Sequence, residues 1–300
     1  MDVLDADSAR QTFRLLFCPH CGSGSLYDPP SEEQLAEHYA ADYFGLQRHK
    51  FLAPVQWLFD IGKRGLARSV VGSLPQGAVP RVLDVGCGTG QLLVELERLG
   101  AVAIGTERAG AASRAVRPGL LVLEGELDDC ASGVGRLDAI VIWHVLEHLR
   151  DPAAVLRTTC RLLPPGGLLF VAVPNSASWQ ARLFGRYWFH LDLPRHLHFF
   201  TRRGLLSVLQ SQGFAAESVG TLQWSQALFG FIQSALNWAA PGQPNRLYRL
   251  LREPLRPATL VEFALWSLAA SLLLPLAVIE TVASAARGSG AVCVVRARKV

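Results

Sequence analysis

The amino-acid sequence predicts an α/β fold: a doubly wound, mostly parallel seven-stranded sheet with an apolar helical insertion before its last strand. Short, nearly continuous apolar runs alternate with helical patterns from residue 80 onward, as in a parallel sheet covered on both faces. The first run leads directly into three glycines at alternate positions, Gly86, Gly88 and Gly90. About seventy residues separate the last two expected strands, far more than the usual connection of roughly 4–6.

Each element of this fold has its own signal in the sequence. The β-rich apolar runs predict strands over 81–85, 101–105, 120–123, 137–143, 168–173, 214–221 and 291–298. Helices are expected over 91–99, 153–163 and 201–212. The second helix ends at Pro164-Pro165-Gly166-Gly167, because proline cannot continue a helix and glycine favours its end.

The chain divides into three expected parts: an N-terminal appendage over 1–45, a main domain over 46–222 plus 291–300, and an apolar and basic insertion over 223–290. In the appendage, Ser31 followed by acidic residues predicts a helix start. Cys18 and Cys21 have the spacing of half a zinc ribbon. A structural zinc needs about four ligands and no second pair exists, so we interpret these cysteines as a degenerate remnant, with a zinc site as the alternative.

Composition narrows the class of protein. Half of the residues are hydrophobic and 18% are charged, against about 25% in an average soluble domain, so apolar side chains are in surplus. The 29 basic and 25 acidic residues give +4, which is no signature of nucleic-acid binding. Six scattered cysteines form no disulfide framework, and the acidic start of the chain is no signal peptide. A cytoplasmic location is therefore expected.

The glycine-rich loop after the first strand predicts a cofactor site. A dinucleotide fingerprint needs Gly-x-Gly-x-x-Gly, but here Gln91 stands where its last glycine belongs, which disfavours NAD. The run 81–90 instead resembles the first loop of class I S-adenosylmethionine (SAM)-dependent methyltransferases, with an acidic residue two places before the first glycine. The resemblance implies that SAM is the cofactor and that the residues of this loop bind it: Asp84, Gly86, Cys87, Gly88 and Gly90.

Two further acidic positions follow the next strands. Glu107 comes about twenty residues after the loop, where a carboxylate accepts hydrogen bonds from the ribose hydroxyls. After the third strand the resemblance implies a residue that holds the adenine amino group. We favour Glu126, with Leu127 packing on the adenine ring, and Asp128 as the competing residue.

Residues 143–152 resemble the family segment that reads Leu-Glu-His-x-x-Asp-Pro, and the resemblance covers 80–222 and 291–299. His144 is expected at the methionine end of SAM. His144, Glu147 and His148 also raise the alternative of a metal, because the similar ubiquinone-pathway O-methyltransferases carry Glu-x-x-Glu-His here. Since His144 replaces the first glutamate and hard cations prefer oxygen ligands, we expect no metal.

The segment 188–201 offers the candidates for proton transfer. It contains an Asp-x-Pro-x-His-x-x-x-Phe pattern that also occurs in a bacterial subgroup of these enzymes. We expect His196 near the substrate, with Asp192 or Arg195 orienting it, and His144 as a second candidate, because imidazole titrates near neutral pH. The alternative is that these histidines only fix the loop by hydrogen bonds.

The insertion holds two apolar stretches, 224–240 and 260–286, around a segment whose arginines repeat at helical spacing opposite leucines, 246–256. This segment has the pattern of an interfacial amphipathic helix. We therefore expect peripheral membrane contact through 224–286, with a buried helical subdomain or a homodimer interface as alternatives.

Together these patterns predict a SAM-dependent methyltransferase, in the cytoplasm or peripheral on the inner membrane. The acceptor is expected to be hydrophobic or lipid-linked, a quinone precursor or a glycan, methylated on oxygen. The alternative from another class is a non-catalytic SAM-binding or membrane-associated scaffold. The clustered histidines and Arg195 favour the enzyme.

Overall fold

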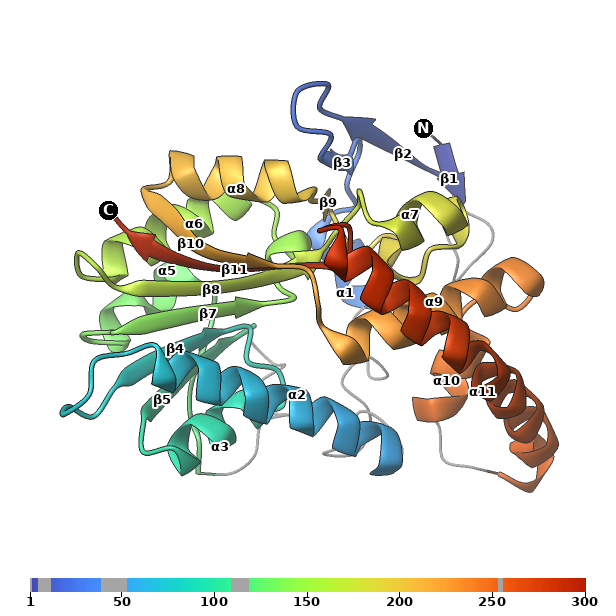
Figure 1. Cartoon of the computed structure of the whole chain (residues 1–300). Helices are drawn as coiled ribbons and strands as arrows, with labels where there is room; N and C mark the ends of the chain where they lie inside the picture. Colours follow the sequence, from blue (N-terminus) through green and yellow to red (C-terminus); the bar gives the residue numbers. More distant parts are fainter. Residues whose placement is uncertain (1, 5–11, 39–52, 109–118, 253–255) are drawn as a thin grey trace.

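The computed structural model describes residues 2–4, 12–38, 53–108, 119–252 and 256–300. Its centre is a seven-stranded sheet in the order β10-β11-β8-β7-β4-β5-β6 (Figure 1). Strands β4 to β8 pair in parallel, and β11 runs antiparallel to both β8 and β10. The expected mostly parallel, seven-stranded sheet is confirmed.

The strands begin and end close to the expected positions. Their bounds are β4 Arg81–Val85, β5 Val102–Glu107, β6 Leu121–Glu124, β7 Ala139–Trp143, β8 Leu168–Pro174, β10 Phe214–Gly220 and β11 Val292–Lys299. The connecting helices are α2 Ala53–Gly72, α3 Gln91–Arg98, α5 Leu127–Cys130, α6 Pro152–Leu162 and α8 Arg202–Ser211. Asp151 accepts a hydrogen bond from the Ala154 amide and so caps α6.

Helices cover both faces of the sheet, α6 and α8 on one and α2 and α3 on the other (Figure 1). The buried side chains of β7 alternate between the two faces. Ile140 and Ile142 pack with the helices of the first face, whereas Ala139 and Val141 pack with those of the second. The period of two along a strand thus divides one apolar run between two cores, as the doubly wound prediction requires.

Three N-terminal strands and one short strand from the segment after β8 build a second, four-stranded sheet in the order β1-β2-β3-β9. Its strands are β1 Asp2–Leu4, β2 Thr12–Phe17, β3 Gly24–Leu26 and β9 His198–Phe199. The helix expected at Ser31 is α1 Glu32–His38, and the Ser31 hydroxyl accepts from the Gln34 amide. Cys18 and Cys21 flank the turn between β2 and β3. In the described part of the chain, neither belongs to a group of three potential metal ligands.

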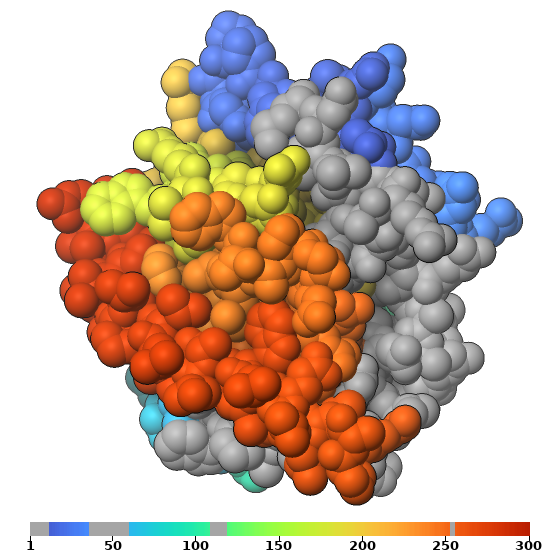
Figure 2. Space-filling model, turned by 90° about the vertical axis from the view of Figure 1, so that its right-hand side faces the viewer, coloured from blue at the N-terminus to red at the C-terminus, as the bar shows by residue number. Residues whose placement is uncertain are grey.

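The insertion contains α9 Trp224–Ala239, α10 Arg246–Arg252 and α11 Pro257–Ala286, which Figure 2 shows as the orange to red face of the molecule. The leucines of α10 are buried: Leu247, Leu250 and Leu251 pack in a core with α9 and α11. The interpretation of this segment as an interfacial helix is therefore wrong, because its apolar side is already covered by protein. Helix α11, by contrast, is long and apolar enough to cross a membrane, and only 6% of its most apolar window is buried.

Candidate active site

The glycine loop turns sharply between β4 and α3, with positive φ angles at Gly86 (67°), Gly88 (56°) and Gly90 (73°). A Cβ added at Gly86 would lie 2.6 Å from Cγ2 of Val145, so only glycine fits there. A Cβ at Gly88 would meet no atom within 4 Å. The loop is thus packed against the segment after β7 on one side and open at Gly88.

Two buried carboxylates stand beside this loop. Glu107 ends β5, and its carboxylate accepts from the Gly88 amide (2.7 Å) and from the Arg108 amide (3.0 Å). Asp84, in β4, is 3% exposed, and burial raises its pKa to about 7. The structure therefore places Asp84 and Glu107 near each other at the carboxyl edge of the sheet, and the two carboxyl groups suit a ligand that carries hydroxyl groups and a positive charge.

The three candidate residues after β6 differ in their exposure and in their contacts. Glu126 is exposed, and its carboxylate lies 3.9 Å from Nε of Arg108. Leu127 is 3% exposed and belongs to the hydrophobic core. Asp128, the competing residue, accepts hydrogen bonds from Thr158 and Arg161 of α6. Of the two acidic candidates, Asp128 is thus committed to a structural contact.

His144 follows β7 and has a positive φ of 58°. Its Nε2 lies 2.8 Å from Oε1 of Gln223, the residue before α9, and its Nδ1 lies 3.5 Å from Oε1 of Glu147. His144 therefore joins the main domain to the insertion. No sequence signal pointed to Gln223, because the contact spans 79 residues.

Glu147 is 1% exposed, and neither of its carboxylate oxygens has a hydrogen-bond partner among the described residues. Burial alone would raise its pKa, but the interaction with His144 and the neighbouring imidazoles of His148 and His196 hold the pKa below its usual value. A buried carboxylate of this kind is tolerated only beside groups that can carry a positive charge.

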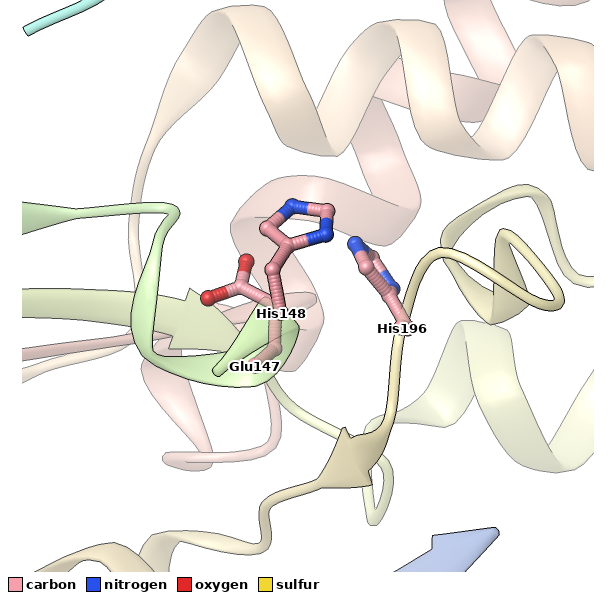
Figure 3. A group of neighbouring side chains, drawn as sticks. All are labelled: Glu147, His148 and His196. Carbon is pink, nitrogen blue, oxygen red and sulfur yellow. The ribbon is translucent and has the colours of Figure 1, made fainter. Parts of the chain in front are cut away.

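His148 and His196 come from separate segments and pack edge to face, with ring centroids 4.5 Å apart (Figure 3). The Nδ1 of His196 lies 2.8 Å from the carbonyl of His190, and the Nδ1 of His148 lies 3.0 Å from the carbonyl of Arg195. A carbonyl only accepts, so both Nδ1 atoms donate. Burial lowers the pKa of His148 to about 4, which keeps this ring neutral near pH 7.

Asp192 and Arg195 form a forked ion pair next to these rings. Nε of Arg195 lies 3.1 Å from each carboxylate oxygen of Asp192, and Oδ2 of Asp192 lies 3.8 Å from Nε2 of His196. Burial would raise the pKa of Asp192, but the Arg195 guanidinium lowers it strongly. The predicted residues His196, Asp192 and Arg195 are therefore in contact, with a carboxylate that is ionised at neutral pH.

The histidine segment is held from two sides by regions outside the main domain. The carbonyl of Leu197 accepts from the Leu26 amide (3.0 Å), and β9 pairs with β3 of the N-terminal sheet. On the other side, Nε2 of His190 lies 3.2 Å from the carbonyl of Gln226 in α9. A Cβ at Gly230 would lie 2.4 Å from the same nitrogen. An isolated glycine in an apolar helix was the one signal for this close approach.

Glu147, His148 and His196 could also hold a cation, because their ligand atoms lie within 4.8 Å of one another (Figure 3). Two imidazoles and one carboxylate suit a transition metal better than Mg²⁺, which prefers oxygen. The sequence expectation was that no metal binds here.

Comparison with known proteins identifies the family of this chain. Residues 48–219 match the family model described as "Methyltransferase domain". A curated "Ubiquinone biosynthesis O-methyltransferase" of Xanthomonas oryzae pv. oryzae is 35% identical over 132 residues, 40% of this chain and 54% of the relative. The protein of the same name from Xanthomonas axonopodis pv. citri is 33% identical over 159 residues, 48% of this chain and 66% of the relative. The match thus spans about half to two thirds of the length of these relatives.

The fold is also similar to that of a solved methyltransferase structure. A SAM-dependent methyltransferase structure from Archaeoglobus fulgidus superposes with a TM-score of 0.50 at 15% identity, covering 80% of this chain and 94% of that one. The match to the family model, together with the fold, defines a class I SAM-dependent methyltransferase. The chain belongs to the methyltransferase-domain family, and its cofactor is SAM.

Proposed function

We propose that this enzyme methylates an oxygen atom, the phenolic hydroxyl of a hydrophobic quinone precursor. The observation that carries the proposal is the buried contact of His148, His196 and Asp192 at the carboxyl edge of the sheet, where ligands bind in open α/β folds. Oxygen nucleophiles need a group that takes up their proton, and imidazole beside a carboxylate does this. The similarity to ubiquinone biosynthesis O-methyltransferases favours a quinone precursor over the hydroxyl of a lipid-linked glycan.

SAM, when bound, supplies a methyl group on a sulfonium, ready for in-line displacement. The chain's own residues fit this cofactor. Asp84 is a buried carboxylate with a raised pKa, which a ligand ammonium group would stabilise in its ionised form. We assign the ribose hydroxyls to Glu107, the adenine to Glu126 and Leu127, and the methionine end to His144. The loop backbone at Gly86, Cys87, Gly88 and Gly90 would approach the ligand.

We assign the role of general base to His196. Its Nδ1 donates to the carbonyl of His190, so Nε2 is the nitrogen that can accept a proton. The positive charge formed on the ring would lie 3.8 Å from Oδ2 of Asp192. Arg195 is a positioning residue that holds this carboxylate, and the 7% exposure of His196 keeps bulk water away.

We further propose that this cluster works with protons alone. Nδ1 of His144 lies 3.5 Å from Oε1 of Glu147, so a side chain of the protein itself contacts this carboxylate, and the donor set is not that of a Mg²⁺ site. Dialysis against a chelator should leave the rate unchanged, and metal analysis of active protein should find less than a molar equivalent. A rate restored only by added metal would contradict this assignment.

The test of the function is an acceptor assay with the full chain, SAM and a prenylated 1,2-dihydroxybenzene in detergent micelles. We expect a product that carries one new methyl group on a ring oxygen, identified by mass spectrometry and NMR. A lipid-linked glycan serves as the competing acceptor. Methylation of the glycan alone, or methylation at carbon, would overturn the proposal while leaving the methyltransferase class intact.

A further inference from the structure

Helix α11 presents an apolar face to solvent. Six side chains define it, each between 51% and 72% exposed: Val261, Leu265, Leu268, Leu272, Ile279 and Val282. Soluble proteins rarely expose so continuous a set of large apolar side chains, so this α11 apolar face indicates a surface that binds another molecule or a membrane.

The α11 apolar face is wider than a helix-pairing seam. The opposite side of α11 packs against α9 through Phe263, Trp266, Ala270 and Leu273. At 100° per residue the six side chains span about 100° of the helix circumference, and the further exposed side chains of Leu260, Leu274, Leu276 and Val278 widen the apolar arc to about 200°. A second helix in a coiled-coil seam covers only the narrow stripe of two positions in seven, so a second copy of this chain would leave most of the arc in water. A bilayer surface covers all of it.

Helix α11 is also tied down at both ends. Arg246 of α10 pairs with Glu262 near its start, and Nε2 of Gln180 donates to Glu280 near its end at 2.7 Å. The strands that flank the insertion, β10 and β11, are hydrogen-bonded neighbours. The helix therefore lies along the surface of the protein (Figure 1), which fits contact in the plane of a membrane rather than a crossing.

A basic hollow of about 450 Å³ lies at the C-terminal end of α11. Gly288 and Ser289, which follow the helix, line it together with the exposed Arg182, Arg202 and Arg203. No carboxylate is among its lining residues in the described part of the chain. Three guanidinium groups beside a broad apolar surface complement phosphate head groups beside acyl chains.

We propose that the α11 apolar face docks in the plane of an anionic phospholipid bilayer, with lipid phosphates in the arginine hollow. Between residues 263 and 279 the helix carries no charged side chain, so its outer half can enter the acyl boundary without desolvating a charge. Docking through the α11 apolar face does not depend on which acceptor the enzyme methylates. For the proposed function, docking would bring the enzyme to the membrane, where a hydrophobic acceptor is concentrated.

The test is flotation of the purified full chain with vesicles of phosphatidylcholine alone and with phosphatidylglycerol added. We expect at least tenfold stronger partition into the anionic vesicles, weakened by salt. The variant Leu265→Gln/Leu268→Gln/Leu272→Gln should lose at least tenfold in partition. The matched control Val79→Gln/Leu99→Gln/Leu121→Gln changes three other exposed apolar side chains and should bind like the unmodified protein.

A second variant separates the two parts of the surface. Arg182→Gln/Arg203→Gln should lower the preference for anionic vesicles and leave binding to neutral ones unchanged. Equal partition of the α11 variant and the control would overturn the proposal. So would a dimer in light scattering that the α11 variant converts to a monomer, because a second copy would then cover the face. Methylation of a water-soluble phenol without vesicles should be the same in all four proteins, so that loss of docking and loss of function are distinguishable.

Discussion

The candidate site has two halves that hold their charges in opposite ways. The glycine-loop half is the loop 86–90 with Asp84 and Glu107, and the histidine half comprises His144, Glu147 and His148 after β7 and the segment 190–196. In the glycine-loop half, the buried Asp84 has a pKa raised to about 7, so its ionised form lacks compensation. In the histidine half, the buried Glu147 and Asp192 have lowered pKa values because His144 and Arg195 stand next to them. The first half is suited to a cationic ligand from outside, whereas in the second half the groups that lower the carboxyl pKa values belong to the chain itself. The four experiments below test this difference.

The largest expected effect is on the histidine half. His196→Gln removes the proposed base but keeps a side chain that can donate toward His190, so kcat should fall by about 10²–10⁴-fold with a nearly unchanged Kd for SAM. The measurement is the pH profile of phenol methylation. The variant should recover rate as pH approaches the phenol pKa near 10, where the acceptor ionises by itself. A parallel fall at every pH would indicate a structural role only.

The next effect belongs to the glycine-loop half. Glu107→Ala removes a carboxylate that accepts from Gly88, and the Kd for SAM should rise by about tenfold or more, since charge-assisted bonds contribute about 1.5–3 kcal/mol. Calorimetric titration measures it, with NAD as a ligand that should not bind. The matched variant Glu126→Ala should have a smaller effect, because that side chain is exposed. An unchanged Kd in Glu107→Ala would exclude the ribose role.

Acid should lower the free energy of unfolding through the buried histidines of the histidine half. Burial lowers the pKa of His148 to about 4 and that of His190 to about 3, below the unfolded value near 6.5. The unfolded chain then binds more protons, so this stability is full above pH 6.5 and is lost as pH falls toward 4, by about 1.4 kcal/mol per unit for each ring. In urea titrations of the SAM-free protein, His148→Gln should flatten this slope. An identical dependence of stability on pH in both proteins would mean that folding does not lower the pKa of His148.

Asp84 should change the free energy of unfolding with pH in the opposite direction, and we expect this effect to be the smallest of the four. Its raised pKa means that the folded protein binds the extra proton, so its contribution is full below about pH 4 and is lost as pH rises through about 7. Asp84→Asn removes this term, and the stability of the SAM-free variant should fall more steeply on acidification than that of the unmodified protein. Saturating SAM should shift this pH dependence in the unmodified protein alone. An effect of SAM in both would place the ammonium elsewhere.

The insertion shows where reasoning from the sequence succeeded and where it failed. Apolar stretches over 224–240 and 260–286 were expected, and α9 and α11 occupy them within a few residues. The arginine-rich segment between them had the periodicity of a lipid-bound helix, yet Leu250 is 1% exposed. Periodicity shows that a helix has an apolar side, and the packing of α9 decides what covers that side.

From residue patterns alone, the sheet, the glycine loop and the acidic positions Asp84 and Glu107 could be predicted, because these depend on residues close in the chain or on adjacent parallel strands. The histidine half, by contrast, depends on how distant segments pack. There Glu147 and His148 after β7 meet His196 from the segment before β9, while β3 and Gln226 of α9 hold that segment in place. Contacts between residues so far apart leave no local pattern, since they form only when the chain closes long loops and buries the groups together.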